Sequence, residues 1–448
     1  MNKKSLLTCA LVAVGVISQA SADNTVYFTG STAFRTQAFN TLNSVAGPSA
    51  GGVFDIPGTT VAGHVAPAIT LSAWGGSHAN GDNAAFMLFH GNIGGSPTFV
   101  DCAWTGSEAG IANITSSPAP NVVNAQTGQP LAGVNNKYLL TTTPAGINAS
   151  QPPSTDLDSA ARQGDVSLAD TSQASSDPLT QGAALVAYGP VCVVPFTWAK
   201  NNNISSAASA AKTAWSRISN VTLPELVNEL SAAQTADVLT GFAADSSTIV
   251  YPVGRNNGSG TRANFENDTT YGLLTPVNQY GIGSGTDGGV TSGTAGGSLT
   301  LISVGNNGYE SGGNVAAALG TTGSTSQTDP NFNEQGTHNA GWIAIGYLGI
   351  SDATTLDATQ STLWLTENGV GESDQAIVGG EYSFWGYENF YGKPGNSGFQ
   401  DTVANVFFNS LQFTVNAAYA GGTGHSPGIP LVDMNCTKPT DGSFPAHN

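Results

Sequence analysis

The stretch STIVYPVGRNNGSGTRANFE, residues 247–266, predicts a strand, a tight turn and a helix in succession. Residues 249–253, IVYPV, are mostly strand formers, and the glycines and asparagines that follow break the strand. The next segment indicates a helix that opens at Ser259, Gly260 and Thr261. A helix N-terminus presents unpaired N–H groups and the positive end of the helix dipole, so this turn predicts an anion site.

The side chains around this turn have the chemistry that binds an oxyanion. Ser259 and Thr261 supply hydroxyl donors, and Gly260 lets the backbone approach a ligand closely. Arg255 precedes the turn and Arg262 follows it, and a guanidinium group fits a tetrahedral oxyanion in fork geometry. The alternative is a glycine-rich turn with capping hydroxyls, but the preceding strand and the flanking arginines favour the anion site. Which arginine contacts the anion stays open.

Other segments combine a strand end with a hydroxyl or a carboxyl group. In TVYFTGSTAFRTQAFNTL, residues 25–42, a short strand ends at a turn that contains Ser31 and Thr32, and a helix follows. Ser77 lies in a Gly-Gly-Ser-His turn after an apolar segment, and Asp170 ends a short apolar strand. For Asp170 the alternative is a helix N-cap. Repetition of this chemistry within one chain is more informative than a single turn.

The first 22 residues, MNKKSLLTCALVAVGVISQASA, have the features of a secretory signal peptide. Two lysines form a basic start, a short apolar core follows, and small residues precede a cleavage site near Ala22. The apolar core is too short to span a bilayer, and no other apolar stretch approaches the length of a membrane span. We therefore expect an exported protein, periplasmic or extracellular after cleavage, with no membrane span.

The charge balance limits the classes of partner. Of the 448 residues, 12 are basic and 30 are acidic, and loss of two lysines with the signal peptide leaves a formal charge of −20. This balance argues against nucleic acid or an anionic membrane as a partner. Only 9% of the residues are charged, against about 25% in ordinary soluble domains, and 57 are glycine. A small anion stays compatible with this composition because its site needs only local donors.

In this order the motifs resemble those of the phosphate-binding proteins of ABC transporters, within the type 2 periplasmic binding protein superfamily. That family holds its ligand with a Thr-Phe pair after the first strand, a serine after a Gly-rich turn and an aspartate that ends a short strand. An arginine and a Ser-Gly-Thr turn complete the site. The resemblance implies these ligand-binding residues: Ser31, Thr32, Ala33, Phe34, Ser77, Asp170, Arg255, Ser259, Gly260 and Thr261.

Later segments add to the resemblance, which covers the chain in blocks. Residues 312–319 are similar to a helix start of the family, residues 340–350 to one of its strands, and residues 221–230 to a helix that here has a capping box. The sequence departs from the family at two points. The first turn, residues 30–34, reads GSTAF where the family has AGATF, and Ser77 and Asp170 lie 93 positions apart, far more than the short separation in the family.

The resemblance implies an α/β fold with the two lobes of a type 2 periplasmic-binding-protein fold and the ligand cleft between them. Long Gly/Ser/Thr-rich insertions are expected in loops. The expected segments are a signal peptide at 1–22, a first lobe at 23–188 and 371–448, a second lobe at 189–370, and insertions at about 78–165 and 268–300.

The implied ligand is inorganic phosphate, and Asp170 is the residue that would select it. An ionised carboxylate accepts but does not donate hydrogen bonds, so it favours an anion that carries a proton over fully ionised sulfate. A buried acceptor that is left unpaired costs about 1–3 kcal/mol, which is enough to discriminate between the two anions.

Three functions compete. The first is an exported protein that binds phosphate and delivers it to an ABC transporter membrane complex. The second is an extracellular matrix or surface protein that keeps the fold without a transport role, which the low charge and the insertions favour. The third is a secreted hydrolase of phosphate esters, which is disfavoured because the histidines are scattered and no cluster has metal-ligand or nucleophile–base spacing. We therefore expect no enzyme, no metal and no cofactor.

Three cysteines remain after export: Cys102, Cys192 and Cys436. An exported protein can pair two of them and leave the third free, because disulfides persist in oxidising compartments. The sequence does not identify the pair.

Overall fold

The structure is a computed structural model. It describes residues 24–43, 60–61, 64–65, 86–93, 96–115, 138, 161–202, 209–282, 299–302, 308–309, 311–320, 342–360, 362–419, 421–422 and 424–447. The predicted signal peptide, Ser77 and much of both predicted insertions lie outside the described residues.

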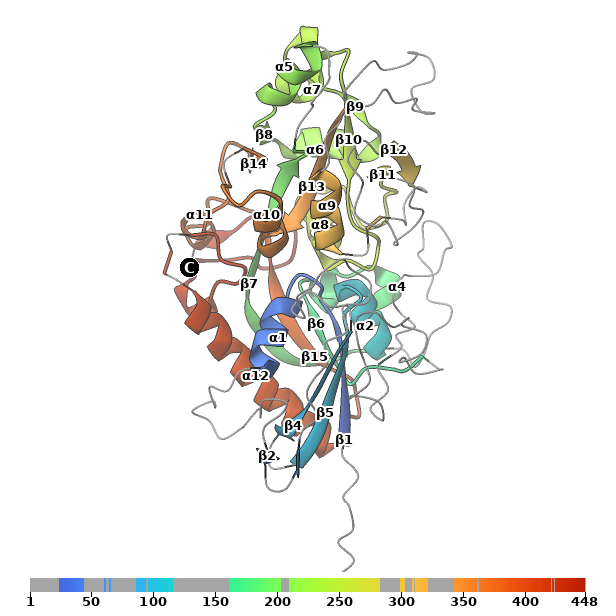
Figure 1. Cartoon of the computed structure of the whole chain (residues 1–448), viewed down its shortest axis with the longest axis vertical. Coiled ribbons are helices and arrows are strands. Elements are labelled where there is room, and N and C mark those ends of the chain that lie inside the picture. Colours follow the sequence, from blue (N-terminus) through green and yellow to red (C-terminus); the bar gives the residue numbers. More distant parts are fainter. Residues whose placement is uncertain are drawn as a thin grey trace, which may run out of the picture.

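One mixed sheet of eleven strands runs through the described part of the chain (Figure 1). Nine of its strands lie in the order β4 (Phe86–Ile93), β5 (Ser96–Ala103), β1 (Asn24–Gly30), β6 (Val166–Ala169), β15 (Trp385–Gly392), β7 (Val186–Lys200), β13 (Ile343–Gly349), β10 (Ile249–Val253) and β9 (Gln234–Thr235). Off this path, β14 (Trp364–Glu367) pairs with β7 and with β8 (Asn220–Val221). The short pairs are β2 (Thr60–Val61) with β3 (His64–Val65), β11 (Gln279–Ile282) with β12 (Leu299–Ile302), and β16 (Cys436–Thr437) with β17 (Ala446–His447).

The long strand β7 joins two groups of strands. Its first part pairs with β15, and residues 196–200 pair with β13. On the β15 side, β1 is parallel to both β5 and β6. On the β13 side, β10 is parallel to β13. Figure 1 shows the β1 group low in the molecule and β10 and β13 high, with β7 between them.

The helices begin where the sequence supplies caps. The predicted capping box at Thr222 and Glu225 is present at the start of α6. Residues 312–319 form α9, as the resemblance implies. The helix bounds are α1 (Arg35–Asn43), α2 (Ser107–Thr115), α4 (Pro178–Gln181), α5 (Ser209–Arg217), α6 (Leu223–Ser231), α7 (Asp237–Thr240), α8 (Gly260–Asp268), α9 (Gly312–Leu319), α10 (Ile350–Leu356), α11 (Asp374–Val378) and α12 (Gly398–Ala418), with 3₁₀ turns at Gln173–Ser175, Ala243–Asp245 and Leu431–Asp433.

The last helix packs on the β1 side of the sheet, as its apolar face predicts. Val403, Phe407 and Leu411 of α12 are buried, and α12 contacts α1. The ring of Phe407 meets that of Phe28 on β1 edge to face at 4.9 Å between centroids. α12 therefore ties the C-terminal part of the chain to its first strand.

An aromatic cluster holds α8 against the centre of the sheet. Trp198 on β7 stacks on Phe384 at 4.9 Å between ring centroids. Phe265 on α8 packs against both Trp198 and Tyr347 of β13, with centroid distances of 6.0 and 4.4 Å. These side chains are almost completely buried. The helix that follows the predicted anion-binding turn is thus anchored by its own buried phenylalanine.

The three cysteines among the described residues are free thiols. Cys102, Cys192 and Cys436 are each buried, and none forms a disulfide. Burial raises the pKa of each thiol above its ordinary value. None of the pairings that the sequence left open is formed among these three cysteines in this structure.

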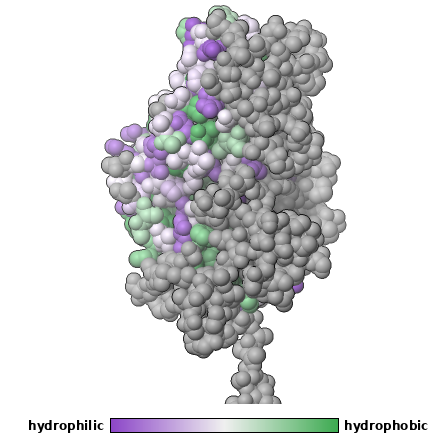
Figure 2. Space-filling view, in the orientation of Figure 1, coloured by the Kyte–Doolittle hydropathy of each residue, from purple (hydrophilic) through white to green (hydrophobic). Residues whose placement is uncertain are grey.

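The surface is mixed in character. Figure 2 shows hydrophilic and hydrophobic residues interspersed over the described part of one face. Among the described residues, no helix combines the length and apolarity needed to cross a membrane.

Candidate anion-binding site

The carboxyl ends of two neighbouring strands bring a hydroxyl and a carboxyl to one edge of the sheet. β1 ends at Gly30 and β6 ends at Ala169, and the two strands are parallel. Ser31 follows β1 and donates its backbone N–H to the carbonyl oxygen of Leu168 at 2.8 Å. Asp170 follows β6. In open α/β sheets, ligands bind outside the carboxyl ends of the strands, so this edge is the candidate site.

A second serine, Ser107, reaches the same edge from α2. β5 is parallel to β1 and leads into α2, which begins at Ser107. The Ser107 hydroxyl donates to Oδ1 of Asp170 and accepts a hydrogen bond from the backbone N–H of Asp170 at 3.1 Å. The sequence analysis did not identify Ser107. Its signal was present in residues 99–114, FVDCAWTGSEAGIANI, where a strand, a Gly-Ser turn and a helix with Glu108 in its first turn follow one another.

The Ser-Gly-Thr turn docks onto Asp170 from the other group of strands. Ser259 is the N-cap of α8, and its hydroxyl accepts from the backbone N–H of Arg262 at 3.3 Å. The Thr261 hydroxyl donates to Oδ2 of Asp170 at 3.1 Å, and the Asn264 side chain donates to the Asp170 carbonyl oxygen at 2.6 Å. The N-terminus of α8 therefore faces the carboxyl group of Asp170.

Arg255 crosses from the second group of strands to the first. Its backbone N–H donates to the Tyr347 hydroxyl at 2.9 Å, and its Nε donates to the Tyr309 carbonyl oxygen at 3.2 Å. Its Nη2 donates to the Thr32 hydroxyl, in the turn after β1, at 2.8 Å. Arg262 instead bonds Glu266 at 2.9 Å and the Arg255 carbonyl oxygen at 3.2 Å. Of the two arginines that the sequence left open, Arg255 is the one that reaches the first turn.

Ala33 and Phe34 immediately precede α1 and both contact the hydrophobic core. Phe34 is completely buried in the hydrophobic core, and Ala33 packs against the same core. Because the Phe34 side chain packs in the core, only backbone groups of Ala33 and Phe34 can contact a ligand. A backbone N–H near a helix N-terminus is a suitable donor to an anion.

Burial sets the electrostatics of the site. The exposed fractions are 8% for Thr32, 1% for Asp170, 2% for Arg255, 1% for Ser259 and 2% for Thr261, so the described site is closed to solvent. Burial raises the pKa of Asp170 above its ordinary value, and the Ser107 hydroxyl, the Arg255 charge and the Thr261 hydroxyl lower it. The site therefore combines hydroxyl and guanidinium donors with one carboxyl in a dry environment.

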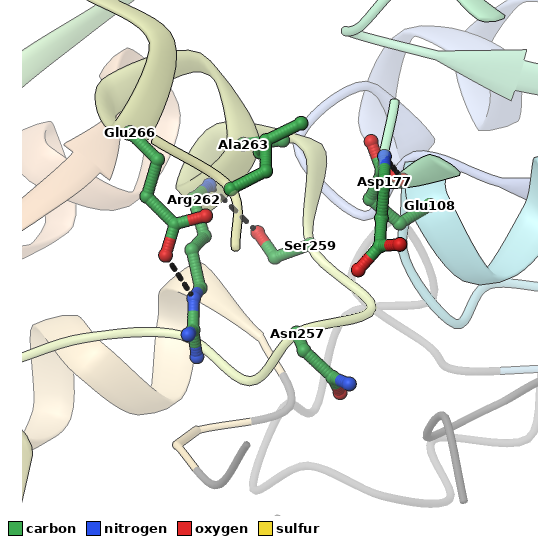
Figure 3. A pocket seen from close by; sticks show the side chains of 8 residues that line it. Glu108, Asp177, Asn257, Ser259, Arg262, Ala263 and Glu266 are labelled. Atoms are coloured by element: carbon green, nitrogen blue, oxygen red, sulfur yellow. Dashed lines mark hydrogen bonds and ion pairs between the residues drawn. The ribbon is translucent and has the colours of Figure 1, made fainter. Parts of the chain in front are cut away.

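A small polar pocket lies on the other side of the turn. Figure 3 shows Arg262 turned toward Glu266 and, across the cavity, Glu108 and Asp177. The pKa of Glu266 is raised to about 7, because burial and, more weakly, the Asp177 charge raise it by more than Arg262 lowers it. With three carboxyl groups against one arginine, this cavity is a poor place for an oxyanion. Its lining residues are Glu108, Asp177, Asn257, Ser259, Arg262, Ala263, Glu266 and Leu273.

Ser77, the remaining predicted site residue, lies outside the described residues. Within the described ranges, no group of three or more His, Cys, Asp or Glu side chains has the arrangement of a metal site.

The contributions of Ser107 and Ser77 to anion binding can be measured separately. If the site binds an anion, replacing Ser107 with alanine is expected to weaken that binding about tenfold, because Asp170 loses a hydroxyl donor and a buried acceptor left unpaired costs about 1–3 kcal/mol. Replacing Ser77 with alanine is expected to weaken binding only if Ser77 also reaches the anion. Calorimetric titration of both variants measures the two affinities, and an unchanged affinity in Ser107→Ala would contradict the placement of Ser107.

Comparisons with known proteins find only distant similarity, all of it to solved structures. No family model matches the chain, and no curated protein matches it. A solved structure from Clostridium perfringens, named as a phosphate ABC transporter substrate-binding protein with bound phosphate, is similar over 88% of this chain and 97% of that chain, with 12% identity and a TM-score of 0.37. PstS from Borrelia burgdorferi has 10% identity over 90% of this chain and 99% of that chain, with a TM-score of 0.30. A phosphate-binding protein from Stenotrophomonas maltophilia has 13% identity over 83% and 79%, with a TM-score of 0.30.

The structural neighbours are thus phosphate-binding proteins of ABC transporters over most of the chain, at low sequence identity. The fold itself is mixed α/β. At these identities and TM-scores the likeness assigns no ligand and no role to any residue.

Proposed function

We propose that the protein is an exported solute-binding protein that binds inorganic phosphate in a cleft between two lobes. The observation that carries the proposal is the convergence of Arg255 and Asp170, both buried, with the hydroxyls of Thr32, Ser107 and Thr261. These groups are spread over residues 32 to 261 and meet at the N-terminal ends of α2 and α8. Buried charges of both signs and converging donors suit an oxyanion.

The proposed lobes follow the two groups of strands. The first lobe, residues 23–188 and 371–448, would hold β1, β5, β6 and α2, and the second lobe, residues 189–370, would hold β10, β13 and α8. β7 and β15 would connect them, and closure of the cleft would be a hinge motion. Export, a periplasmic or extracellular location and delivery to an ABC transporter membrane complex belong to the same proposal.

The hydrogen-bond donors and acceptors of the site favour phosphate over sulfate. Arg255, the hydroxyls and the backbone N–H groups are donors that any tetrahedral oxyanion satisfies. An ionised Asp170 only accepts hydrogen bonds. It therefore favours binding of hydrogen phosphate, which carries a proton, and disfavours sulfate, which carries none. Among the described site residues no serine or threonine is paired with a histidine base, which favours binding over catalysis.

Titration calorimetry of residues 23–448 with phosphate and then sulfate, near neutral pH, tests the proposal. The protein should first be partly unfolded, dialysed and refolded, so that bound ligand is removed. Tight binding of phosphate without binding of sulfate is expected. Sulfate binding alone would remove Asp170 from the site. Binding of neither anion would overturn the proposal and favour a matrix or surface protein built on the same fold.

Replacing Asp170 with asparagine is expected to reverse the selectivity. The amide can donate to an unprotonated oxyanion, so sulfate binding should appear, while phosphate affinity falls about tenfold to a hundredfold because of the lost acceptor. Asp401→Asn is the matched control, since Asp401 on α12 bonds only the Tyr188 hydroxyl among the contacts described and lies away from the site. Calorimetry with both anions measures the switch, and a variant that still excludes sulfate would speak against it.

A further inference from the structure

A second carboxyl lies next to the anion site, on β15. Glu388 is 0% exposed, and neither of its carboxyl oxygens has a hydrogen-bond partner among the described residues. β15 pairs antiparallel with β6, with Phe390 opposite Leu168 and Asn389 opposite Ala169. The next step of this register sets Glu388 opposite Asp170. Residues opposite each other in an antiparallel pair present their side chains on the same face of the sheet.

Ser31, in the turn after β1, lies next to this carboxyl. Its buried hydroxyl lowers the pKa of Glu388 as a hydrogen-bond donor, although no hydrogen bond of ordinary geometry joins either group to a partner among the described residues. Burial, first, and the charge of Asp170, second, raise the pKa of Glu388 well above its ordinary value. The Glu388 carboxyl and the Ser31 hydroxyl, neither with a hydrogen bond of ordinary geometry, therefore lie beside Asp170.

The other titratable and charged groups around Glu388 lie on β7 and on the helices packed against β15. Cys192 lies opposite Glu388 on β7, and burial first and then Glu388 raise the pKa of its thiol. The charged groups of the helices packed against β15 have partners elsewhere in the structure: Arg262 with Glu266, Asp268 with Lys438, and Asp401 with Tyr188. Asp170 is thus the charge that acts on Glu388.

On the basis of the phosphate-binding function above, we propose that Glu388 is a specificity-determining residue of the anion site, which limits the negative charge that the closed site accepts. Buried polar groups in native proteins normally have partners, and an orphaned pair next to a binding site points to a partner supplied by the ligand or its hydration. A neutral carboxyl group can donate one hydrogen bond toward the site. An ionised one adds a second negative charge next to Asp170 and opposes any anion.

The pH dependence of phosphate affinity follows with a definite sign. While Glu388 is neutral, wild type and Glu388→Gln should bind phosphate alike, because both side chains are uncharged donors of similar shape. As the pH rises through the raised pKa of Glu388, the wild type acquires a charge that the variant lacks. The ratio of the two affinities cancels the titration of phosphate itself, so it reports Glu388 together with its coupling to Asp170.

The test is the phosphate affinity of both proteins by calorimetry from about pH 6 to about pH 9.5. We expect affinities within about threefold at the acid end and a wild type about tenfold weaker than Glu388→Gln at the alkaline end. Glu229→Gln is the matched control. Glu229 on α6 is also buried, with neither oxygen partnered among the described residues and with its pKa raised by burial, but it lies outside the site. Its profile should follow the wild type.

Ser31→Ala gives an independent check that does not depend on folding of the Glu388 variant. Loss of the hydroxyl that lowers the pKa of Glu388 should move the alkaline fall in affinity to higher pH. Parallel profiles of wild type and Glu388→Gln, or an unmoved fall in Ser31→Ala, would overturn the role of Glu388 while leaving phosphate binding intact. Absence of phosphate binding by the wild type at every pH would instead overturn the proposed function.

Discussion

Replacing Gly260 with alanine is expected to weaken phosphate binding more than a hundredfold while leaving the fold intact. A Cβ at this position would lie 1.7 Å from Oδ1 of Asp170 and 2.6 Å from Cβ of Ser107. The Asp170 carboxyl could rotate away, but Ser107 Cβ is fixed by the first turn of α2. The N-terminus of α8 must therefore withdraw, and Thr261 loses its hydrogen bond to Asp170. Each charge-assisted hydrogen bond lost from a buried site costs about 1.5–3 kcal/mol, or about ten- to a hundredfold in affinity.

Gly398→Ala separates this clash from the general effect of the substitution. Gly398 is also the first residue of a helix and also follows a serine N-cap, but a Cβ there meets no atom within 4 Å. This variant should bind phosphate like the wild type, and its free energy of unfolding should rise by at most about 1 kcal/mol, since alanine is the better helix former. Calorimetry measures binding and thermal unfolding measures stability. A Gly260→Ala protein with wild-type affinity would refute the contact between α8 and Asp170.

The parts of the site that the sequence predicted are those whose signals lie within one short stretch. Strand formers, breaking residues and a capping serine occur within residues 247–266, and the structure has β10 at Ile249–Val253 and α8 from Gly260 in that stretch. The ends of β1 and β6 were predicted in the same way. Local backbone chemistry is sufficient for such elements, because strand propensity, turn residues and caps act over a few positions.

The parts that the sequence missed depend on strand order. Ser77 and Ser107 each follow a glycine, and the local sequence does not show which of the two serines reaches the site. Ser107 meets Asp170 because β5 lies beside β1 and β1 beside β6, which is a property of the sheet as a whole. Glu388 is a similar case. Its place next to Asp170 follows from the antiparallel pairing of β15 with β6, between segments more than two hundred positions apart.

Replacing Arg255 with alanine is expected to weaken phosphate binding more than a hundredfold. The guanidinium group is buried and donates to Thr32 at 2.8 Å, so it is held at the turn after β1. Its charge also lowers the pKa of Asp170, so the substitution should raise that pKa further and favour the neutral acid, which no longer only accepts. Hydrogen bonds from a charged donor contribute about 1.5–3 kcal/mol each, and a tetrahedral oxyanion can accept two from one guanidinium group.

Three further variants locate the anion relative to the turn. Arg255→Lys keeps the charge but not the fork and should recover part of the affinity. Arg217→Ala removes an arginine that pairs with Asp245 far from the site, with 34% of its side chain exposed, and should bind phosphate normally. Arg262→Ala should disturb Glu266 but leave most of the affinity. If Arg262→Ala loses binding and Arg255→Ala keeps it, the anion lies in the cavity next to Glu266, where at least one carboxyl would have to be protonated to admit it.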